Sequence, residues 1–295
     1  MSKLIADFLE RRFPQNQIAP SHFGQLLSTY QCSGLAPPNL VQEVIGGGDG
    51  KFWSHIWETM LYRHFSNLGF TFRLDRVKKA GQLGPDFGLV HKGNTIWIEA
   101  VTPSPEGIPP DYLEPVRRGE VKVRTMPHEQ MLLRWTSVVK DKRDKLQRYI
   151  DKKIILATDC TIIAVNGCRL SDFAVDDLGI SQLPFAVEAV FPVGPIAVPI
   201  TRDGQLSGEP TRIPRYAIRK PSGSAVSTAN FLNPLYANVS AVMGCYRRDM
   251  IDGVLPLTIV HNPLASACLP RGVLGATKEY VADDQGDDYL VRQLI

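Results

Sequence analysis

Apolar residues recur at helical spacing in two long segments of the chain. In residues 52–68 the apolar positions, three or four residues apart, are Trp53, Ile56, Trp57, Met60, Leu61, Phe65 and Leu68. In residues 129–153 a similar stripe is made by Leu132, Trp135, Val139, Leu146, Tyr149 and Ile150. Both patterns predict amphipathic helices with a buried face. Shorter amphipathic helices are expected over residues 3–13, 22–31 and 39–45.

Strand patterns lie between and after the two long helices. Residues 70–74 predict a first strand, and two apolar runs at 87–90 and 95–101 flank the polar segment 91–94, as in an antiparallel hairpin. The continuous apolar run 161–165 predicts a buried strand that lies parallel to the second hairpin strand after a helical crossover. The order helix, strand, hairpin, helix, strand predicts an α/β fold with a mixed central sheet flanked by helices.

This order suggests three parts of the chain. Residues 1–48 form an N-terminal helical segment, residues 49–175 the α/β core, and residues 176–295 a β-rich extension packed on that core. Within the extension, residues 187–200 contain three prolines and are expected to form an edge strand at best. Residues 201–230 predict an extended loop, and residues 238–245 and 257–261 predict further strands.

Two acids in the hairpin are the first candidates for chemistry. If Val90 pairs with Thr95, Asp86 falls directly opposite Glu99 on the same face, with Cβ atoms roughly 4.5–5.5 Å apart. Two carboxylates this close repel each other unless a proton or a cation lies between them. The hairpin is therefore a candidate site for a divalent metal. The alternative is that Asp86 is a turn residue and Glu99 a solvated strand residue, and a slip of one residue would separate the pair.

The sequence Pro85-Asp86, followed by a strand, a short turn and an apolar strand that ends in Glu99, resembles the PD-(D/E)xK nuclease superfamily. The resemblance implies a restriction-endonuclease-like core. It also implies that Asp86, Glu99 and Glu58, the one acid of the helix 52–68, hold Mg²⁺ or Mn²⁺. The implied activity is hydrolysis of phosphodiester bonds in nucleic acid, with a DNA endonuclease as the form expected.

One position departs from the pattern of this superfamily. Its lysine belongs two residues after the second acid, where this chain has Val101. Because the superfamily tolerates relocation of this lysine to the following helix, Lys145 is the first candidate and Lys142 the second. The alternative is a nucleic-acid-binding protein that keeps the nuclease fold without catalysis. A protein–protein module that binds through its long proline-containing loops is a third class.

Charge is concentrated in one segment. The net charge is only +3, but residues 115–153 hold twelve Lys or Arg against five Asp or Glu. Such a segment is typical of contact with a phosphate backbone, although it also fits a solvated charged helix. The candidates for nucleic-acid binding are Lys122, Arg124, Arg134, Lys140 and Arg143.

The remaining signals are weaker. No run of about 18 apolar residues exists, so no membrane span is expected, and the N-terminal residues lack the features of a signal peptide. The five cysteines are scattered and show neither zinc spacing nor a disulfide framework, which favours free thiols and a cytoplasmic location. His55 and His64 lack the spacing of a zinc-binding helix and are expected to be packing or surface residues. The sequence leaves the oligomeric state open, and a homodimer is compatible with it.

Overall fold

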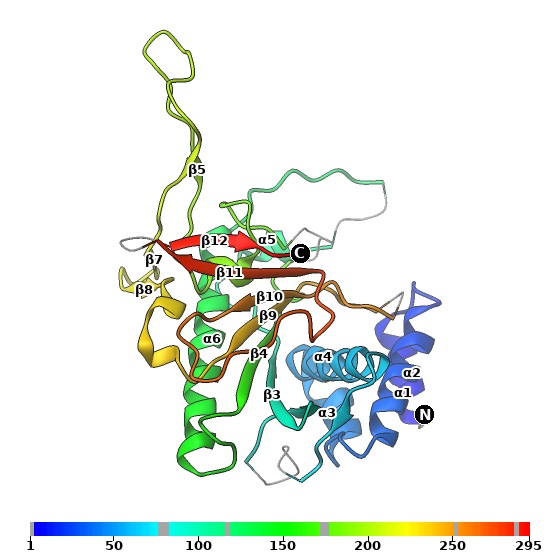
Figure 1. Cartoon of the computed structure of the whole chain (residues 1–295). Coiled ribbons are helices and arrows are strands. Elements are labelled where there is room, and N and C mark those ends of the chain that lie inside the picture. The colour runs from blue at the N-terminus through cyan, green and yellow to red at the C-terminus, as the bar shows by residue number, and fades with distance from the viewer. Residues whose placement is uncertain (1–2, 76–82, 116–118, 172–176, 251–252, 286–288) are drawn as a thin grey trace.

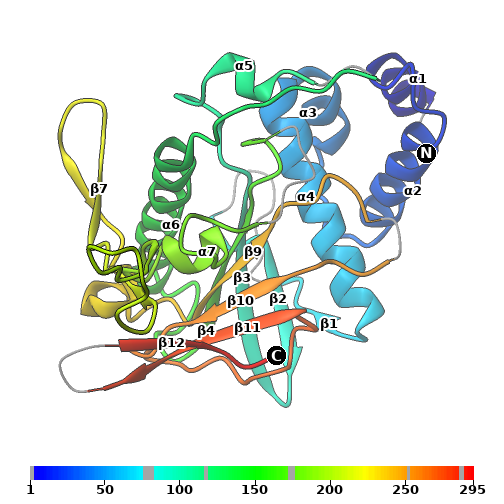
Figure 2. The same cartoon turned by 90° about the horizontal axis from the view of Figure 1, so that it is seen from above.

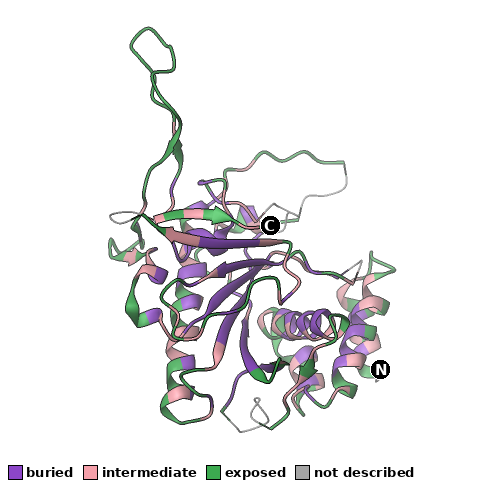
Figure 3. Ribbon diagram, viewed as in Figure 1, coloured by how far each residue is buried: buried purple, intermediate pink, exposed green. Residues whose placement is uncertain are grey.

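The computed structural model describes residues 3–75, 83–115, 119–171, 177–250, 253–285 and 289–295. Its centre is a mixed eight-stranded sheet with strand order β1-β2-β3-β4-β9-β10-β11-β12 (Figure 1). The bounds of these strands are β1 Thr71–Phe72, β2 Phe87–His91, β3 Asn94–Val101, β4 Cys160–Asn166, β9 Ala241–Cys245, β10 Thr258–His261, β11 Lys278–Asp284 and β12 Tyr289–Gln293. Most residues of the central strands β3, β4, β9 and β10 are buried, as Figure 3 shows. The prediction of an α/β fold with a mixed central sheet flanked by helices is confirmed.

The hairpin β2–β3 has the register predicted from its apolar pattern. Val90 lies opposite Thr95, and Phe87 lies opposite Ile98. Gly93 has a φ of 82°, a backbone conformation that glycine adopts without steric cost, so the turn can close at this position. β4 pairs with β3 in parallel, as predicted for a strand that returns after a helical crossover.

Helices cover both faces of the sheet. The first four helices, α1 (Lys3–Arg12), α2 (Ala19–Cys32), α3 (Leu40–Gly46) and α4 (Gly48–Asn67), gather on one side, and α6 (His128–Asp151) lies on the other (Figure 2). Trp57 of α4 donates a hydrogen bond to the Ala164 carbonyl of β4 at 3.0 Å, which fixes α4 against the sheet. Three glycines join the two helices: Gly46 ends α3, Gly47 caps it, and Gly48 begins α4. No helix in the described part of the chain is long and apolar enough to cross a membrane.

The chain after residue 175 extends the same sheet. It contributes β9 to β12, so the boundary expected at residue 175 does not separate two sheets. Strands β11 and β12 were not predicted from the sequence, because charged residues interrupt their apolar pattern. The strand expected over residues 187–200 is wrong for most of its length: Phe185–Glu188 form the short helix α7, and only Ile196–Ala197 form a strand, β5.

Four short strands form two ribbons outside the central sheet. β5 pairs with β6 (Thr211–Arg212), and β7 (Ala217–Arg219) pairs with β8 (Ala225–Ser227). The predicted loop over residues 201–230 is therefore partly ordered as β-structure. The ribbon that contains β5 projects away from the body of the molecule (Figure 1). A further short helix, α5 (Pro110–Leu113), follows β3.

Trp97 lies across a glycine in the neighbouring strand. Gly88 of β2 is the direct partner of Trp97, and a Cβ atom at Gly88 would lie 2.5 Å from the Trp97 ring. The indole is fully buried and donates a hydrogen bond to Asp159 Oδ2 at 2.8 Å. Glycine at position 88 therefore leaves the space that the buried indole occupies.

We expect Gly88→Ala to lower the free energy of unfolding by about 1–3 kcal/mol, because the added methyl group overpacks the hairpin. Urea denaturation followed by tryptophan fluorescence measures the change. The matched control is Gly46→Ala at the end of α3, where an added Cβ meets nothing within 4 Å. Equal stability of the two variants would contradict the proposed role of Gly88.

Candidate active site

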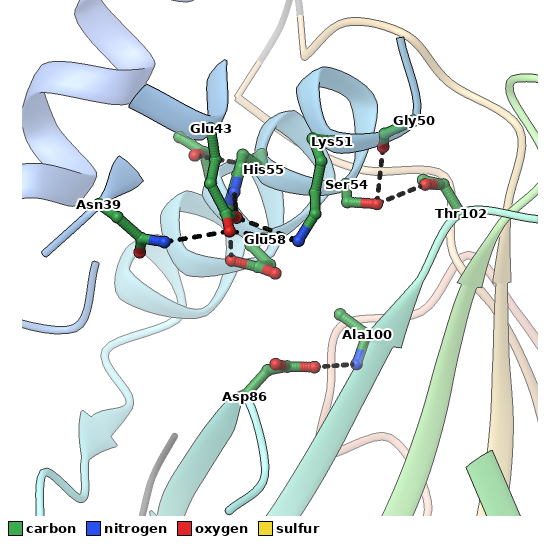
Figure 4. Close-up of polar contacts among 11 residues, drawn as sticks. Asn39, Glu43, Gly50, Lys51, Ser54, His55, Glu58, Asp86, Ala100 and Thr102 are labelled. Carbon is green, nitrogen blue, oxygen red and sulfur yellow. Dashed lines mark hydrogen bonds and ion pairs between the residues drawn. The ribbon is translucent and has the colours of Figure 1, made fainter. Parts of the chain in front are cut away.

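Asp86 extends the hairpin pairing by one step beyond β2. Its N–H donates to the Ile98 carbonyl at 3.1 Å, and its Oδ2 accepts a hydrogen bond from the Ala100 N–H at 2.8 Å (Figure 4). The regular pairs of the hairpin end with Phe87 and Ile98, and Asp86 lies close enough to Glu99 for the charge of Glu99 to act on it. Asp86 is 8% exposed, and Glu99 has no exposed surface. The structure therefore brings the two predicted acids together at one buried place.

Glu99 is bound by three side chains from one face of α6. Lys142 Nζ lies 2.7 Å from Glu99 Oε1, and Lys145 donates to the same oxygen. The Tyr149 hydroxyl is 3.3 Å from Oε2. Spacings of three and four residues place these side chains on one side of the helix. Burial alone would raise the pKa of Glu99, but Lys142 and Lys145 outweigh it and hold that pKa below its ordinary value.

Asp86 is in a different electrostatic state. Burial raises the pKa of Asp86 to about 7, and the nearby charges of Glu99 and Glu58 act in the same direction against the smaller opposing effect of Lys142 and Lys145. Burial disfavours the charged form of a carboxyl group, and so does a neighbouring negative charge. The site therefore pairs an ionised acid with one that titrates near neutral pH. Positive charge placed beside Asp86 would favour its ionised form.

Glu58 of α4 is held by a second polar cluster beside Asp86 (Figure 4). His55 Nδ1 is 3.3 Å from Glu58 Oε2, and His55 Nε2 is 2.8 Å from Glu43 Oε2. Burial lowers the pKa of His55, but the hydrogen bonds and charges of Glu58 and Glu43 outweigh it, so the net shift is upward. Carboxylates on both ring nitrogens fit an imidazolium that donates from each. His55 is thus more than the packing or surface residue expected from its sequence spacing.

A cleft of about 410 Å³ opens beside these acids. Its walls come from α3, α4, β3 and its following loop, α6 and the loop after β4. The acids on its walls are Glu43, Glu58 and Asp86, and the cations are Lys51, Lys142 and Arg169. Hydroxyl groups of Ser54, Thr102 and Ser104 lie between them, with Ser54 and Thr102 2.9 Å apart and hydrogen-bonded. The cleft therefore offers both anionic and cationic walls to a ligand.

The five residues predicted to contact nucleic acid are all described, and none of them lines this cleft. Arg134 pairs with Glu106 at 3.3 Å. Arg143 pairs with Asp144 at 3.1 Å and lies over the Tyr236 ring. The other contacts are those of Lys140 with Asp144, Lys122 with Glu114, and Arg124 with the carbonyls of Tyr112 and Glu114. Residues 116–118 of the same basic segment lie outside the described residues. Much of the local charge is thus paired on the surface.

The two lysine candidates both reach the acid pair. The sequence ranks Lys145 ahead of Lys142 because Lys145 shares a helix face with Arg134. Both donate to Glu99 Oε1, but of the two only Lys142 lines the cleft. Lys142 is therefore the better placed of the two to approach a ligand.

The carboxyl groups are hard oxygen donors that suit Mg²⁺ or Mn²⁺. In the described part of the chain, no three His, Cys, Asp or Glu side chains are arranged as a ready-made metal cluster. Glu58 is bonded to His55, and Glu99 is bonded to Lys142 and Lys145. Mg²⁺ usually keeps several waters and binds through only one or two carboxylates together with substrate phosphates. Asp86 together with Glu99 or Glu58 supplies the one or two carboxylates that such an ion needs. The donor set therefore fits such an ion, although the set of three ligands expected from the sequence is not assembled.

Sequence reasoning missed four titratable residues of the site: Glu43, Lys51, His55 and Arg169. The spacing of His55 and Glu58, three residues apart on one helix, was a usable signal for their contact. Arg169 follows β4, and its approach to the end of β3 depends on the parallel pairing of these strands. Lys51 binds Glu43 at 3.2 Å across two helices, which no local pattern reveals.

Comparison of the chain with family models, curated proteins and solved structures gives no match. The geometry of the site itself is distinctive: two neighbouring buried acids, two lysines on one of them, and a cleft beside the other. These features meet near the carboxyl ends of the parallel strands β3 and β4. Ligands bind outside such strand ends in open α/β sheets.

The pKa of Asp86 predicts a pH-dependent effect of Asp86→Asn on stability. A pKa raised from 3.8 to about 7 on folding means that protonation stabilises the native state. That contribution is complete below pH 3.8 and is lost as the pH rises through 7. Asparagine does not titrate and keeps an oxygen for the Ala100 N–H. The stability of Asp86→Asn relative to the wild type should therefore rise between pH 5 and pH 8, by up to about 1.4 kcal/mol per pH unit.

Urea denaturation at several pH values in the presence of EDTA measures this difference without bound metal. The matched control is Asp111→Asn, which removes an exposed carboxyl group outside the cleft and for which the difference should stay nearly constant. A pH-independent difference for Asp86→Asn would contradict the buried, charge-repelled state of Asp86.

The lysines make a separate prediction for Glu99. Glu99→Gln should lower the free energy of unfolding by about 3 kcal/mol, because it leaves two largely buried ammonium groups without their carboxylate. The side chains of Lys142 and Lys145 are only 18% and 23% exposed. Glu106→Gln, which breaks the pair between Arg134 and the 79% exposed Glu106, should change stability by less than about 1 kcal/mol. Similar losses of unfolding free energy for the two variants in urea denaturation would show that Glu99 does not compensate the buried charges of Lys142 and Lys145.

Proposed function

We propose that the protein is a metal-dependent nuclease that hydrolyses phosphodiester bonds, with DNA as its substrate and internal cleavage as its mode. The observation that carries this proposal is the proximity of the acids Asp86 and Glu99, with Lys142 bound to Glu99 and lining an open cleft together with Asp86. Two acids and a lysine at one place are the groups that the PD-(D/E)xK resemblance implies. A nucleic-acid partner and a cytoplasmic location belong to the same proposal.

The order of the structural elements supports the proposal. α4, β1, the hairpin β2–β3, α6 and β4 follow one another as helix, strand, hairpin, helix and strand. The hairpin is antiparallel, and β4 is parallel to β3 across the α6 crossover. This is the order expected from the resemblance, so we propose a restriction-endonuclease-like core for these elements. The strands β9 to β12 then extend that core on one side.

Each residue has a role that its position suggests. Asp86 and Glu99 would hold Mg²⁺ or Mn²⁺, with Glu58 close enough to influence the charge of Asp86. Such an ion, when bound, lowers the pKa of a coordinated water and polarises the scissile phosphate. Lys142 can orient the attacking water or stabilise negative charge that develops on the phosphate. Lys145 keeps Glu99 ionised and in place.

A second candidate function rests on the lysines themselves. Because Lys142 and Lys145 already neutralise Glu99, the buried charge is balanced without a metal. The chain would then be a nucleic-acid-binding protein that keeps the fold without catalysis. It would bind DNA with affinity that falls steeply with salt, and divalent ions would produce no turnover.

Cleavage assays distinguish the two functions. The purified wild type should convert supercoiled plasmid to nicked or linear DNA with Mg²⁺ or Mn²⁺, and EDTA should stop the reaction. Asp86→Asn and Lys142→Ala should each lower the rate at least about a hundredfold, because each removes a group that stabilises the transition state. Lys140→Ala, a lysine on an exposed part of α6 outside the cleft, should cleave at the wild-type rate.

Identical purification of all variants tests for a contaminating nuclease. Undiminished cleavage by Asp86→Asn would refute the assignment of the site. Salt-dependent DNA binding without cleavage by the wild type, in either ion, would favour the second candidate.

A further inference from the structure

Arg169 stands at the cationic side of the cleft, next to the start of α4. It follows β4 by three residues and lines the cleft together with Gly50, Ser54 and Thr102. A Cβ atom at Gly50 would lie 3.4 Å from Arg169 Nη1, which places the guanidinium beside the first turn of α4. The position of Arg169 is therefore set by β4 on one side and by α4 on the other.

The guanidinium is partly removed from water without a compensating bond. Burial lowers the pKa of Arg169, and no hydrogen bond or ion pair joins its side chain to another residue in the described ranges. Asp49, whose charge acts on Arg169, is bound at 2.8 Å by Arg12. A guanidinium carries five N–H donors in a rigid fork that matches phosphate oxygens. Arg169 therefore has donors available where the cleft opens.

The other two cations of the cleft differ from Arg169. Lys51 is bound to Glu43 and Lys142 to Glu99. The three hydroxyl groups on the walls, Ser54, Thr102 and Ser104, add neutral donors near the same space. An anionic group that entered the cleft would thus meet an open guanidinium and hydroxyls on one side, and the acid pair and Lys142 on the other.

We propose that Arg169 binds a phosphate of the substrate backbone next to the one that is cleaved. This inference rests on the proposed nuclease function and adds a residue that positions the strand across the acid pair. In this arrangement Lys142 acts on the scissile phosphate, and Arg169 holds its neighbour. The predicted basic residues of α6 play no part in this contact.

The first experiment measures binding alone. Fluorescence anisotropy with a labelled DNA oligonucleotide in EDTA should show that Arg169→Gln weakens binding at least tenfold and reduces the slope of log affinity against log salt by about 1. Arg169→Lys should restore part of the affinity. The matched control is Arg219→Gln, which removes an exposed arginine on β7 and should bind as the wild type does.

The second experiment measures cleavage with Mg²⁺. Arg169→Gln should raise KM by a larger factor than it lowers kcat, whereas Lys142→Ala should act mainly on kcat. Wild-type affinity and KM for Arg169→Gln would overturn the proposal. Circular dichroism and thermal unfolding of the variant should match the wild type, since Arg169 bonds to no described residue.

The two experiments separate the failure of this inference from the failure of the nuclease function. If no protein cleaves DNA but binding depends on Arg169, the phosphate contact stands and hydrolysis is refuted. If cleavage depends on Asp86 but neither KM nor affinity depends on Arg169, the nuclease function stands and the phosphate contact of Arg169 is refuted. Competition by inorganic phosphate and by a nucleoside monophosphate tests the source of the phosphate: binding of these through Arg169, with no binding of the oligonucleotide, would refute the backbone contact.

Discussion

A buried negative charge on Glu99 is the constraint on which the site depends. The residue lies within an apolar strand and has no exposed surface, and an isolated ion in such a place costs several kcal/mol. Lys142, Lys145 and Tyr149 supply the compensation from a single face of α6. The same contacts hold α6 in one rotation against β3. The contacts that compensate the charge of Glu99 are therefore also contacts that hold α6 against the sheet.

The strand register turns this requirement into an arrangement of two unlike acids. The hairpin pairs end with Phe87 and Ile98, and the next residue on each strand is one of the two acids, so Asp86 and Glu99 lie close enough for their charges to interact. The lysines bind Glu99, and the Ala100 N–H binds Asp86. One acid is thereby kept ionised, whereas the pKa of the other lies near neutrality. Glu99 therefore stays negatively charged, and a bound cation would favour the ionised form of Asp86 as well.

The parts of this arrangement that local patterns determine were predictable. Apolar alternation around a Gly-Asn turn signal predicted the hairpin, although the turn itself is formed by Lys92 and Gly93. The acid pair followed only on the condition that Val90 pairs with Thr95, which the structure meets. Helical periodicity located α4 and α6 to within a few residues. The contacts of each helix with other elements were harder to predict. Arg134 binds Glu106 instead of lining the cleft, and Arg169 enters it only because β4 pairs with β3. Such contacts depend on how distant segments pack, which a pattern along the chain does not contain.

The PD-(D/E)xK pattern would place a lysine where this chain has Val101, and the lysines beside Glu99 come from α6 instead. Residues 99 and 101 of a strand share a face, so a lysine at position 101 would project to the same side of the sheet as Glu99. Lys142 reaches Glu99 on that side from the helix, with its Nζ 2.7 Å from Oε1. A helix can deliver two lysines three residues apart to one carboxylate, whereas the strand offers a single neighbouring position. The helix therefore places two cations beside the fully buried Glu99 without a lysine at position 101.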